Sequence, residues 1–221
     1  MFLYRKFYYI FRITISLPFL LPHIFLFYLK DDKITKDIAR WSDILEFRNK
    51  RGVTSFLKII IKCKEFRNLF YFRHLMILKS NDHPIFKKII ILPNYIAARL
   101  FLKELPTLYI GGDIGGGLFI QHGFASMIQP EKMGENCIVA QQVTIGCNNG
   151  KSPVIGNNVR ISAGTIVIGG IKIGDNSEIG PNSLVIRNIP ANSTAVSQPS
   201  YIVKKDGKWL LEKIESFDTD Q

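Results

Sequence analysis

Aliphatic side chains recur at every sixth position in the C-terminal half of this chain, at Ile155, Ile161, Val167, Ile173, Ile179 and Val185. A period of six fits neither an α-helix, which repeats at about 3.6 residues, nor a simple strand, which repeats at about 2. It predicts one short strand and one turn per repeat, stacked into a parallel β-helix with the aliphatic side chains inside. A second inward row is expected four positions later, at Val159, Thr165, Ile171, Ser177, Ser183 and Ile189.

The same spacing extends upstream with two interruptions. Its upstream members are Leu108, Ile114, Ile120, Ser126, Met133, Val139 and Ile145. One extra residue falls between Gln129 and Lys132, and ten positions separate Ile145 from Ile155. The second interruption predicts a loop of about four extra residues around positions 147–151, and insertions in solenoids map to loops on one face, often the binding face.

The positive charge of the chain is concentrated in its N-terminal half. The 221 residues include 29 Lys and Arg against 18 Asp and Glu, a net charge of +11. Residues 1–105 hold 20 basic and 8 acidic residues, whereas residues 106–221 hold 9 and 10. Basic residues interleaved with aromatic ones indicate nucleic acid, an anionic membrane surface or a solvated helical face. No nucleic-acid-binding motif is present, so the membrane surface is favoured over nucleic acid.

Residues 1–105 are expected to form a basic, aromatic-rich helical region. Residues 1–30 contain an uncharged stretch from Ile13 to Leu29, interrupted by Pro18 and Pro22. Three interpretations stay open for this segment: a membrane-surface anchor, a buried or oligomer-facing helix, and a spanning helix, for which the stretch is short.

Helices are then expected over residues 32–48, 53–79 and 85–105. Asp32 or Thr35 would cap the first, and Pro93 would break the third. The β-helix should occupy residues 106–199, and residues 200–221 should form an amphipathic tail that folds back as a cap.

Three cysteines, Cys63, Cys137 and Cys147, are an odd number without metal-ligand spacing. They indicate reduced thiols in the cytoplasm and no metal site. Cys147 falls in the inserted loop, where it is interpreted as a bystander.

His122 is the candidate catalytic residue. It is the one histidine of the repeat region, and it follows the inward residue Ile120 by two positions, which places it at a corner or facing outward. A neutral imidazole near pH 7 is suited to take a proton from a hydroxyl group. The chain is therefore predicted to use His122 as a general base.

Three motifs carry a resemblance to a known family. They are IGGGLFIQHG at positions 114–123, QQVTIG at 141–146 and ISAG at 161–164. Residues 105–203 resemble the serine acetyltransferase branch of the hexapeptide acyltransferases. The segment EFRNLFYFR at 65–73 resembles family members of capsule and O-antigen biosynthesis. The resemblance implies a left-handed β-helix, a homotrimer with active sites between subunits, and acetyl-CoA as co-substrate in a groove between coils.

The resemblance also implies roles for individual residues. Backbone N–H groups near Gly146 would stabilise the oxyanion, and Ala163, Gly164 and Pro181 would contact the pantetheine chain, although the family usually has alanine where Pro181 stands. The CoA phosphates would meet one or more basic residues among Arg160, Lys172, Arg187, Lys204 and Lys205, and Lys205 is the predicted cofactor-binding residue. The acceptor would lie near Gln121, Gln141, Lys151 and Ser152.

Departures from the family pattern bear on the acceptor. Serine enzymes of the family carry aspartate where Gln121 stands, and Arg-His where Lys151 and Ser152 stand. They also commonly end in an isoleucine that docks into cysteine synthase, whereas this chain ends in Gln221. A sugar hydroxyl needs no charged partner, and it suits amide and hydroxyl side chains.

The first prediction is therefore an acetyl-CoA-dependent O-acetyltransferase acting on a sugar of a surface polysaccharide or its precursor. It would work in the cytoplasm, at the inner face of the plasma membrane. The alternatives are a serine O-acetyltransferase of cysteine biosynthesis and a non-catalytic hexapeptide scaffold.

Overall fold

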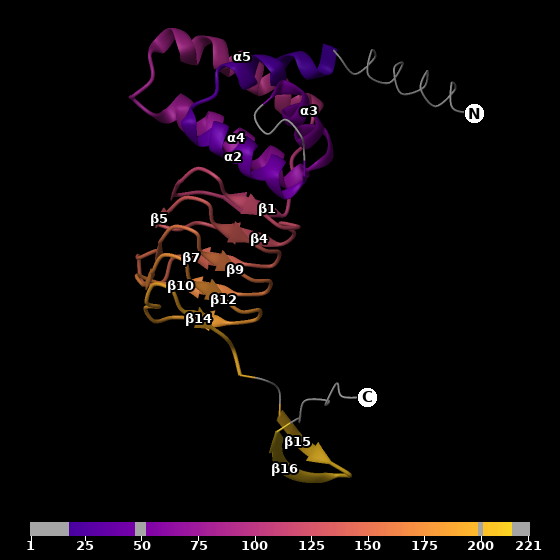
Figure 1. Ribbon diagram of the computed structural model, residues 1–221, viewed down its shortest axis with the longest axis vertical. Coiled ribbons are helices and arrows are strands. Elements are labelled where there is room, and N and C mark those ends of the chain that lie inside the picture. The colour runs from indigo at the N-terminus through magenta and orange to yellow at the C-terminus, as the bar shows by residue number, and fades with distance from the viewer. Residues whose placement is uncertain (1–17, 47–51, 199–200, 214–221) are drawn as a thin grey trace, which may run out of the picture.

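The computed structural model describes residues 18–46, 52–198 and 201–213. Figure 1 shows a layer of helices at one end of the long axis, a stack of short strands beneath it, and a β-hairpin beyond the last coil. The stack is the predicted left-handed parallel β-helix, preceded by an α-helical region.

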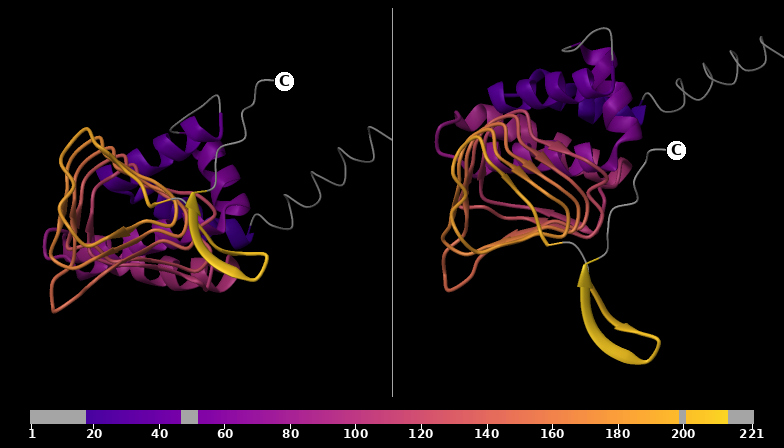
Figure 2. Two further views of the ribbon diagram at one scale, coloured as in Figure 1. Left: turned by 90° about the horizontal axis from the view of Figure 1, so that it is seen from below. Right: turned by 60° about the horizontal axis from the view of Figure 1, so that its bottom comes forward.

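Three parallel sheets form the faces of the β-helix. The β1 sheet has the order β1-β4-β7-β10-β13, the β2 sheet β2-β5-β8-β11 and the β3 sheet β3-β6-β9-β12-β14. The strands are β1 (Leu108–Ile110), β2 (Asp113–Ile114), β3 (Phe119–Ile120), β4 (Ser126–Ile128), β5 (Lys132–Met133), β6 (Ile138–Val139), β7 (Thr144–Gly146), β8 (Val154–Ile155), β9 (Arg160–Ile161), β10 (Ile166–Ile168), β11 (Lys172–Ile173), β12 (Glu178–Ile179), β13 (Leu184–Val185) and β14 (Thr194–Ala195). The triangular cross-section is visible in Figure 2.

The predicted inward rows fill the interior of the coils. The six aliphatic residues from Ile155 to Val185 that recur at every sixth position are all buried. In the second row, Val159, Thr165, Ile171, Ser177 and Ser183 are buried too. Ile189, the last member of that row, is only half-buried, because it lies at the end of the stack. The buried hydroxyls donate to backbone carbonyls, as Thr165 does to Gly180 at 3.0 Å, so their burial leaves no donor unpaired.

Asparagine makes one row of corners possible. Asn158, Asn176 and Asn192 have positive φ values of 55–57°, a conformation that asparagine tolerates better than most residues. Their side chains form a ladder, in which Asn158 donates to Asn176 and Asn176 donates to Asn192, both at 3.0 Å. The polar residues between the aliphatic positions therefore define the turns of the repeat.

The corner between β3 and β4 is longer than its counterparts. The inward residues Ile120 and Ile128 are eight positions apart, whereas Val139 and Ile145, which pair with them in the next coil, are six apart. Two extra residues therefore expand this corner, which contains His122.

The predicted position of the single extra residue, between Gln129 and Lys132, is wrong, because that segment is shortened and the insertion lies before β4. Ile128 and Met133 are five positions apart, one fewer than the regular spacing. The two-residue expansion before β4 and this one-residue contraction after it together produce the single extra residue seen in the sequence.

The helix predicted over residues 32–48 ends earlier, at Ile44, and begins with a different cap. α2 spans Asp32–Ile44, and its N-cap is Asp31, whose side chain accepts from the Ile34 N–H at 2.8 Å. Asp31, which directly precedes Asp32, is the cap in place of the predicted Asp32 or Thr35, because its extended conformation lets its carboxylate reach the free amide of the first turn.

The predicted helix over residues 53–79 is two helices. α3 spans Val53–Lys62 and α4 spans Lys64–Lys79, with Cys63 extended between them. The Arg67 side chain donates to the Ile60 carbonyl at 2.7 Å and also to that of Ile61. These bonds satisfy carbonyl groups that the break leaves without helical partners. Because a side chain from the following helix supplies them, the hydrophobic spacing of the sequence did not reveal the break.

α5 spans Ile85–Phe101 and continues through Pro93, contrary to the predicted break. Pro93 lies on the exposed face, where solvent can satisfy the carbonyl group that a proline leaves unpaired.

A buried ion pair joins the helical layer to the first coil. Asp37 of α2 accepts from Arg73 Nε at 2.8 Å and from the Gly117 and Leu118 N–H groups at 2.7 and 3.1 Å. Arg73 of α4 donates to the carbonyls of Ile114 and Gly115, both at 2.6 Å. These contacts fix α2 and α4 on the turn before β3.

The two ends of the chain bear on the remaining predictions. Residues 18–28 are helical, whereas residues 1–17 of the predicted anchor lie outside the described residues. No helix in the described ranges is long and apolar enough to cross a membrane. The tail forms a hairpin of β15 (Tyr201–Lys205) and β16 (Lys208–Lys213), which extends away from the coils and does not cap them.

Candidate active site

His122 lies exposed at the expanded corner between β3 and β4. Its φ of 63° is in the left-handed region, which is uncommon for a residue other than glycine. The Phe124 N–H donates to the His122 carbonyl, so the turn closes tightly after it. The position agrees with the predicted corner, and the unusual backbone conformation belongs to the kind found at functional sites.

Two neighbours hold this corner in place. The Gln142 N–H of the next coil donates to the Phe124 carbonyl at 2.8 Å. From the other side, Glu65 at the start of α4 packs against the corner, since a Cβ added to Gly123 would lie 2.9 Å from Glu65 Cγ. The His122 backbone is therefore fixed by both the β-helix and the helical layer.

An open groove of about 350 Å³ runs along the same corner across successive coils. Five predicted site residues line it, namely Gln121, His122, Gln141, Ala163 and Pro181. The groove thus brings together the predicted general base, the two amide side chains and the two residues expected to contact pantetheine.

The groove also contains residues that the sequence reasoning did not assign to it. Ala140 and Ser162 follow the inward residues of β6 and β9, as Gln121 follows that of β3. The six-residue phase could have revealed them, because equivalent positions of stacked coils lie side by side. Small side chains at Ala140 and Ala163 leave room for a narrow, extended ligand.

Arg160 is the phosphate-binding candidate that lines the groove. Its Nε lies 3.6 Å from a Glu178 carboxylate oxygen, and both side chains are about half exposed. By contrast, Lys172 lies in the β2 sheet, and the Lys204 ammonium lies over the Trp209 ring of the hairpin. The side chain of Lys205 lies outside the described residues.

Gly146, Lys151 and Ser152 lie at a different corner of the same chain. Gly146 ends β7, and the loop to β8 follows it, whereas the His122 corner precedes the β1 sheet. Within the loop, Asn148 and Lys151 exchange backbone hydrogen bonds of 3.0 and 3.2 Å, and the loop projects from the triangle in Figure 2. A single chain thus places these predicted residues at the opposite edge of the β1 sheet from His122.

Gly164 has a role in stacking and does not line the groove. Its φ is 71°, and an added Cβ would lie 2.2 Å from Asn182 Oδ1 in the following coil. The neighbouring coil therefore requires glycine at this position.

Cysteine and metal chemistry have no support at this corner. Cys137 is buried, and this burial raises the pKa of its thiol to about 11, which leaves it unreactive near neutral pH. Cys147 is exposed in the inserted loop, away from His122. Within the described ranges, no cluster of His, Cys, Asp and Glu side chains could hold a metal ion.

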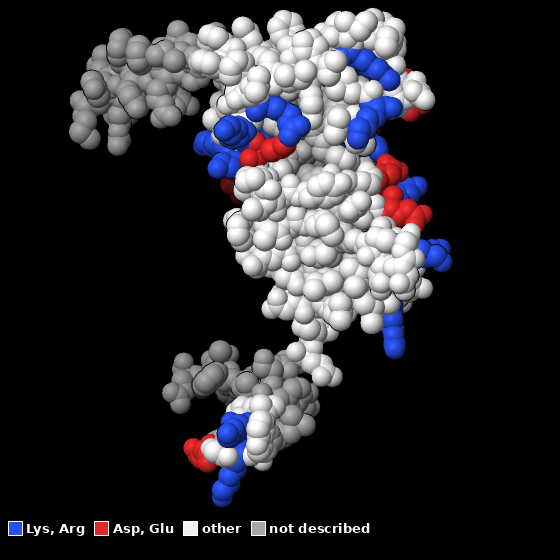
Figure 3. All heavy atoms as spheres, turned by 180° about the vertical axis from the view of Figure 1, so that it is seen from behind, with Lys and Arg blue, Asp and Glu red and all other residues white. Residues whose placement is uncertain are grey.

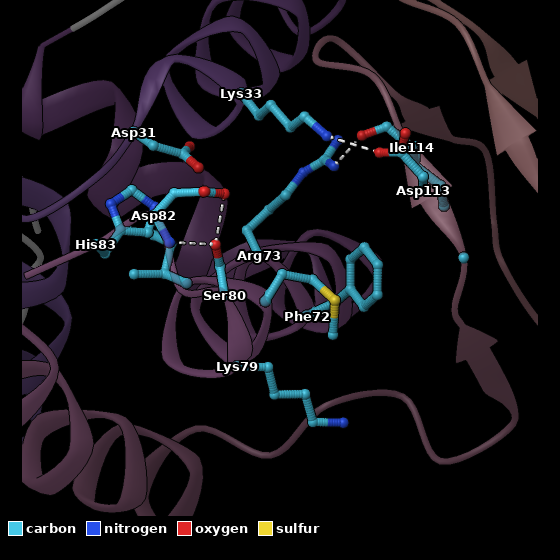
Figure 4. Close-up of a pocket in the computed structure, with 13 residues that line it drawn as sticks. Asp31, Lys33, Phe72, Arg73, Lys79, Ser80, Asp82, His83, Asp113 and Ile114 are labelled. Carbon is cyan, nitrogen blue, oxygen red and sulfur yellow. Dashed lines mark hydrogen bonds and ion pairs between the residues drawn. The ribbon is translucent and has the colours of Figure 1, made fainter.

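A larger cavity of about 500 Å³ lies between the helical layer and the first coil. Figure 4 shows Lys33 and Arg73 reaching across it toward Asp113 and Ile114. Lys33 donates to Asp113 at 2.9 Å, and Arg73 is committed to the buried ion pair. Because these charged groups already have partners, this cavity is the weaker candidate for chemistry.

Comparisons with known proteins show what this chain is similar to. Residues 152–187 match the family model "Bacterial transferase hexapeptide (six repeats)". A serine acetyltransferase of Staphylococcus xylosus is 38% identical over 137 residues, covering 57% of this chain and 61% of the relative. One of Staphylococcus aureus is 39% identical over 138 residues, with 57% and 64% covered. The chain is similar to the serine acetyltransferases. It spans less than two thirds of the length of these curated relatives.

Solved structures show the same fold. Soybean serine acetyltransferase aligns with a TM-score of 0.54 at 23% identity, covering 76% of this chain and 68% of that one. Isoform 3 from Entamoeba histolytica, solved in complex with cysteine, aligns with a TM-score of 0.52 at 25% identity, covering 79% and 61%. These relatives are named serine acetyltransferases, which was the alternative prediction. They do not support the predicted sugar acceptor or a closeness to enzymes of polysaccharide biosynthesis.

Proposed function

We propose that this protein is an acetyl-CoA-dependent O-acetyltransferase with His122 as its general base. The observation that carries the proposal is the exposed imidazole of His122, which lines a groove that crosses successive coils. The imidazole would take the proton of an acceptor hydroxyl while the oxygen attacks the thioester carbonyl carbon. The C–S bond then breaks, and the departing CoA thiolate receives the proton from the imidazolium, so the enzyme returns to its starting state.

Acetyl-CoA would lie along the groove with its pantetheine chain over Ala140 and Ala163. Pro181 would contact the same chain further along, and Arg160 at the groove is the residue best placed to meet a phosphate. Lys205 stays a prediction. The small side chains of Ala140, Ser162 and Ala163 in the groove support this placement, because they leave room for a narrow chain.

A homotrimer would complete the site. One chain leaves Gly146, Lys151 and Ser152 at the far edge of the β1 sheet, so a neighbouring subunit must supply them if they act beside His122. The outward face of the β1 sheet supports such an association, because it exposes large apolar side chains at Tyr109, Met127, Ile166 and Leu184. Exposed apolar rows of this kind favour burial against another subunit.

L-serine is the acceptor that the relatives favour. The second candidate is a sugar hydroxyl, which one specific observation favours: Gln121, next to His122 in the groove, is a neutral amide. A neutral amide binds an ammonium group less well than a carboxylate does, whereas it can bind a hydroxyl group through either its oxygen or its nitrogen. The use of acetyl-CoA would place either reaction in the cytoplasm.

The test is acetyl transfer by purified protein with labelled acetyl-CoA, first with L-serine and then with simple and nucleotide-activated sugars. His122→Ala should lower turnover by about 10²–10⁴-fold with the preferred acceptor, as expected for the loss of a general base. His83→Ala is the matched control, because His83 lies in the turn after α4 and outside the groove. Turnover of His122→Ala close to that of the control would exclude the proposed role. A product with serine alone would exclude the sugar.

A further inference from the structure

The outer face of α5 is apolar along its whole length. Ile85, Ile89, Leu92, Ile96 and Leu100 recur at helical spacing and are all exposed, Ile85 to 72% and Leu100 to 71%. The opposite side of α5 is also apolar, and it supplies the buried residues of the helix. A surface helix normally presents polar residues to water, so this outer face lacks its partner.

A second helix extends the same surface. Residues 18–28 expose Phe19, Leu21, Phe25 and Tyr28, and the Phe19 ring lies 4.9 Å from that of Phe101 at the end of α5. The two helices thus form one continuous apolar face, which we call the end face. In Figure 1 both helices lie at the end of the molecule farthest from the hairpin.

The charges beside the end face are mainly positive. Residues 18–30 and 83–103 contain Lys30, Lys87, Lys88, Arg99 and Lys103 and no aspartate or glutamate, whereas Asp31, Asp82 and Glu104 directly flank these segments, and Glu104 pairs with Arg99. In Figure 3 the outermost helical surface is largely free of charged side chains, and Lys and Arg side chains lie just below it together with some Asp and Glu side chains. An apolar surface bordered mainly by cations matches the layered chemistry of an anionic membrane, with acyl chains beneath phosphate groups.

We propose that the end face docks the protein onto an anionic lipid surface. The exposed apolar side chains of α5 and residues 18–28 enter the acyl boundary, and Lys87 and Lys103 contact lipid phosphates. A second copy of the chain is a poorer occupant, because two such faces would bring like charges together. The inference does not depend on the acyltransfer proposal, and it concerns helices that lie at the opposite end of the helical layer from the β-helix.

The test measures binding of the full chain to vesicles of phosphatidylglycerol and phosphatidylcholine, and to phosphatidylcholine vesicles alone. Wild type should bind the anionic vesicles at least about tenfold more tightly, and added salt should weaken that binding. Replacement of Ile89, Ile96 and Leu100 by Ser should weaken it by at least about tenfold. Lys87→Glu with Lys103→Glu should do the same while leaving the apolar residues intact. Circular dichroism confirms that each variant is folded.

Matched controls lie at the other end of the molecule. Ile186→Ser removes an exposed apolar residue after β13, and Lys172→Glu reverses a charge in the β2 sheet; both should bind vesicles like wild type. Residues 1–17 are present in every variant. If the α5 variants bind vesicles as tightly as wild type, another part of the chain is responsible for the membrane affinity, and the proposal is wrong. Failure of wild type to bind anionic vesicles would overturn it too. If wild type self-associates without binding vesicles, and only the end-face variants abolish that self-association, the end face instead binds a second copy of the chain.

Discussion

Replacing Asp37 by Ala should detach the helical layer from the β-helix. The carboxylate accepts from the Arg73 guanidinium and from the Gly117 and Leu118 N–H groups, and all of these atoms are buried or nearly so. The alanine variant leaves a buried guanidinium without its counter-charge and two amides without an acceptor. Breaking one partner of a buried ion pair costs about 3–5 kcal/mol, and an orphaned buried amide costs about 1–3 kcal/mol, with the two effects overlapping.

We therefore expect Asp37→Ala to lower the free energy of unfolding by about 3–5 kcal/mol, a large part of the 5–15 kcal/mol typical of a domain. Lys33→Ala is the matched control. It breaks the Lys33–Asp113 pair between the same two parts of the chain, but both side chains are substantially exposed. An exposed pair contributes about 0–1 kcal/mol, so the control should unfold almost like wild type.

Urea denaturation followed by tryptophan fluorescence measures this difference. Trp41 of α2 is buried and donates from Nε1 to the Leu118 carbonyl at 2.9 Å, so its emission reports the junction. Trp209 is exposed in the hairpin and should contribute an unchanging background. If Asp37→Ala unfolds within about 0.5 kcal/mol of Lys33→Ala, the junction does not depend on the ion pair, and this reasoning is wrong.

Two further predictions concern a buried histidine and a coil corner. Burial lowers the pKa of His23, whose Nε2 lies 2.8 Å from the Tyr71 hydroxyl, to about 4. Between pH 6.5 and 4 the unfolded chain therefore binds a proton that the folded chain excludes. The contribution of His23 to stability should be complete above pH 6.5 and should fall by about 3 kcal/mol as the pH drops to 4. The urea midpoint of His23→Gln should depend less on pH than that of wild type, and an identical pH dependence would show that His23 is not the responsible group. Gly164→Ala should cost about 1–3 kcal/mol, because it combines a positive φ with a clash against Asn182. Gly150→Ala, at a φ of 76° but in open space, should cost less in thermal melts, and equal losses would show that only backbone strain matters.

Much of the fold was predictable from short-range pattern. The six-residue spacing specified the coils, their inward rows and the position of the inserted loop, because each inward residue packs against its equivalents in adjacent coils. His122 could be placed at a corner for the same reason, since its distance from Ile120 fixes its side of the strand. The Asn and Gly residues of the corners followed from the backbone conformations that tight turns require.

The helical region was less predictable, because contacts distant in sequence decided it. The break at Cys63 depends on the Arg67 side chain folding back onto carbonyls of the preceding helix. The course of α5 through Pro93 depends on which face of the helix meets solvent. No local pattern contains that information.

The candidate site shows the same division. Sequence identified Gln121, His122, Gln141, Ala163 and Pro181, and the tertiary structure brought them into one groove because the coils stack in register. Only the structure separated Gly146, Lys151 and Ser152 from His122, since they leave the β1 sheet at its opposite edge. It also showed that the expanded corner is held against α4 through Gly123 and Glu65. Periodicity determines which side chains point inward or outward, whereas the geometry of the coils decides which outward side chains meet.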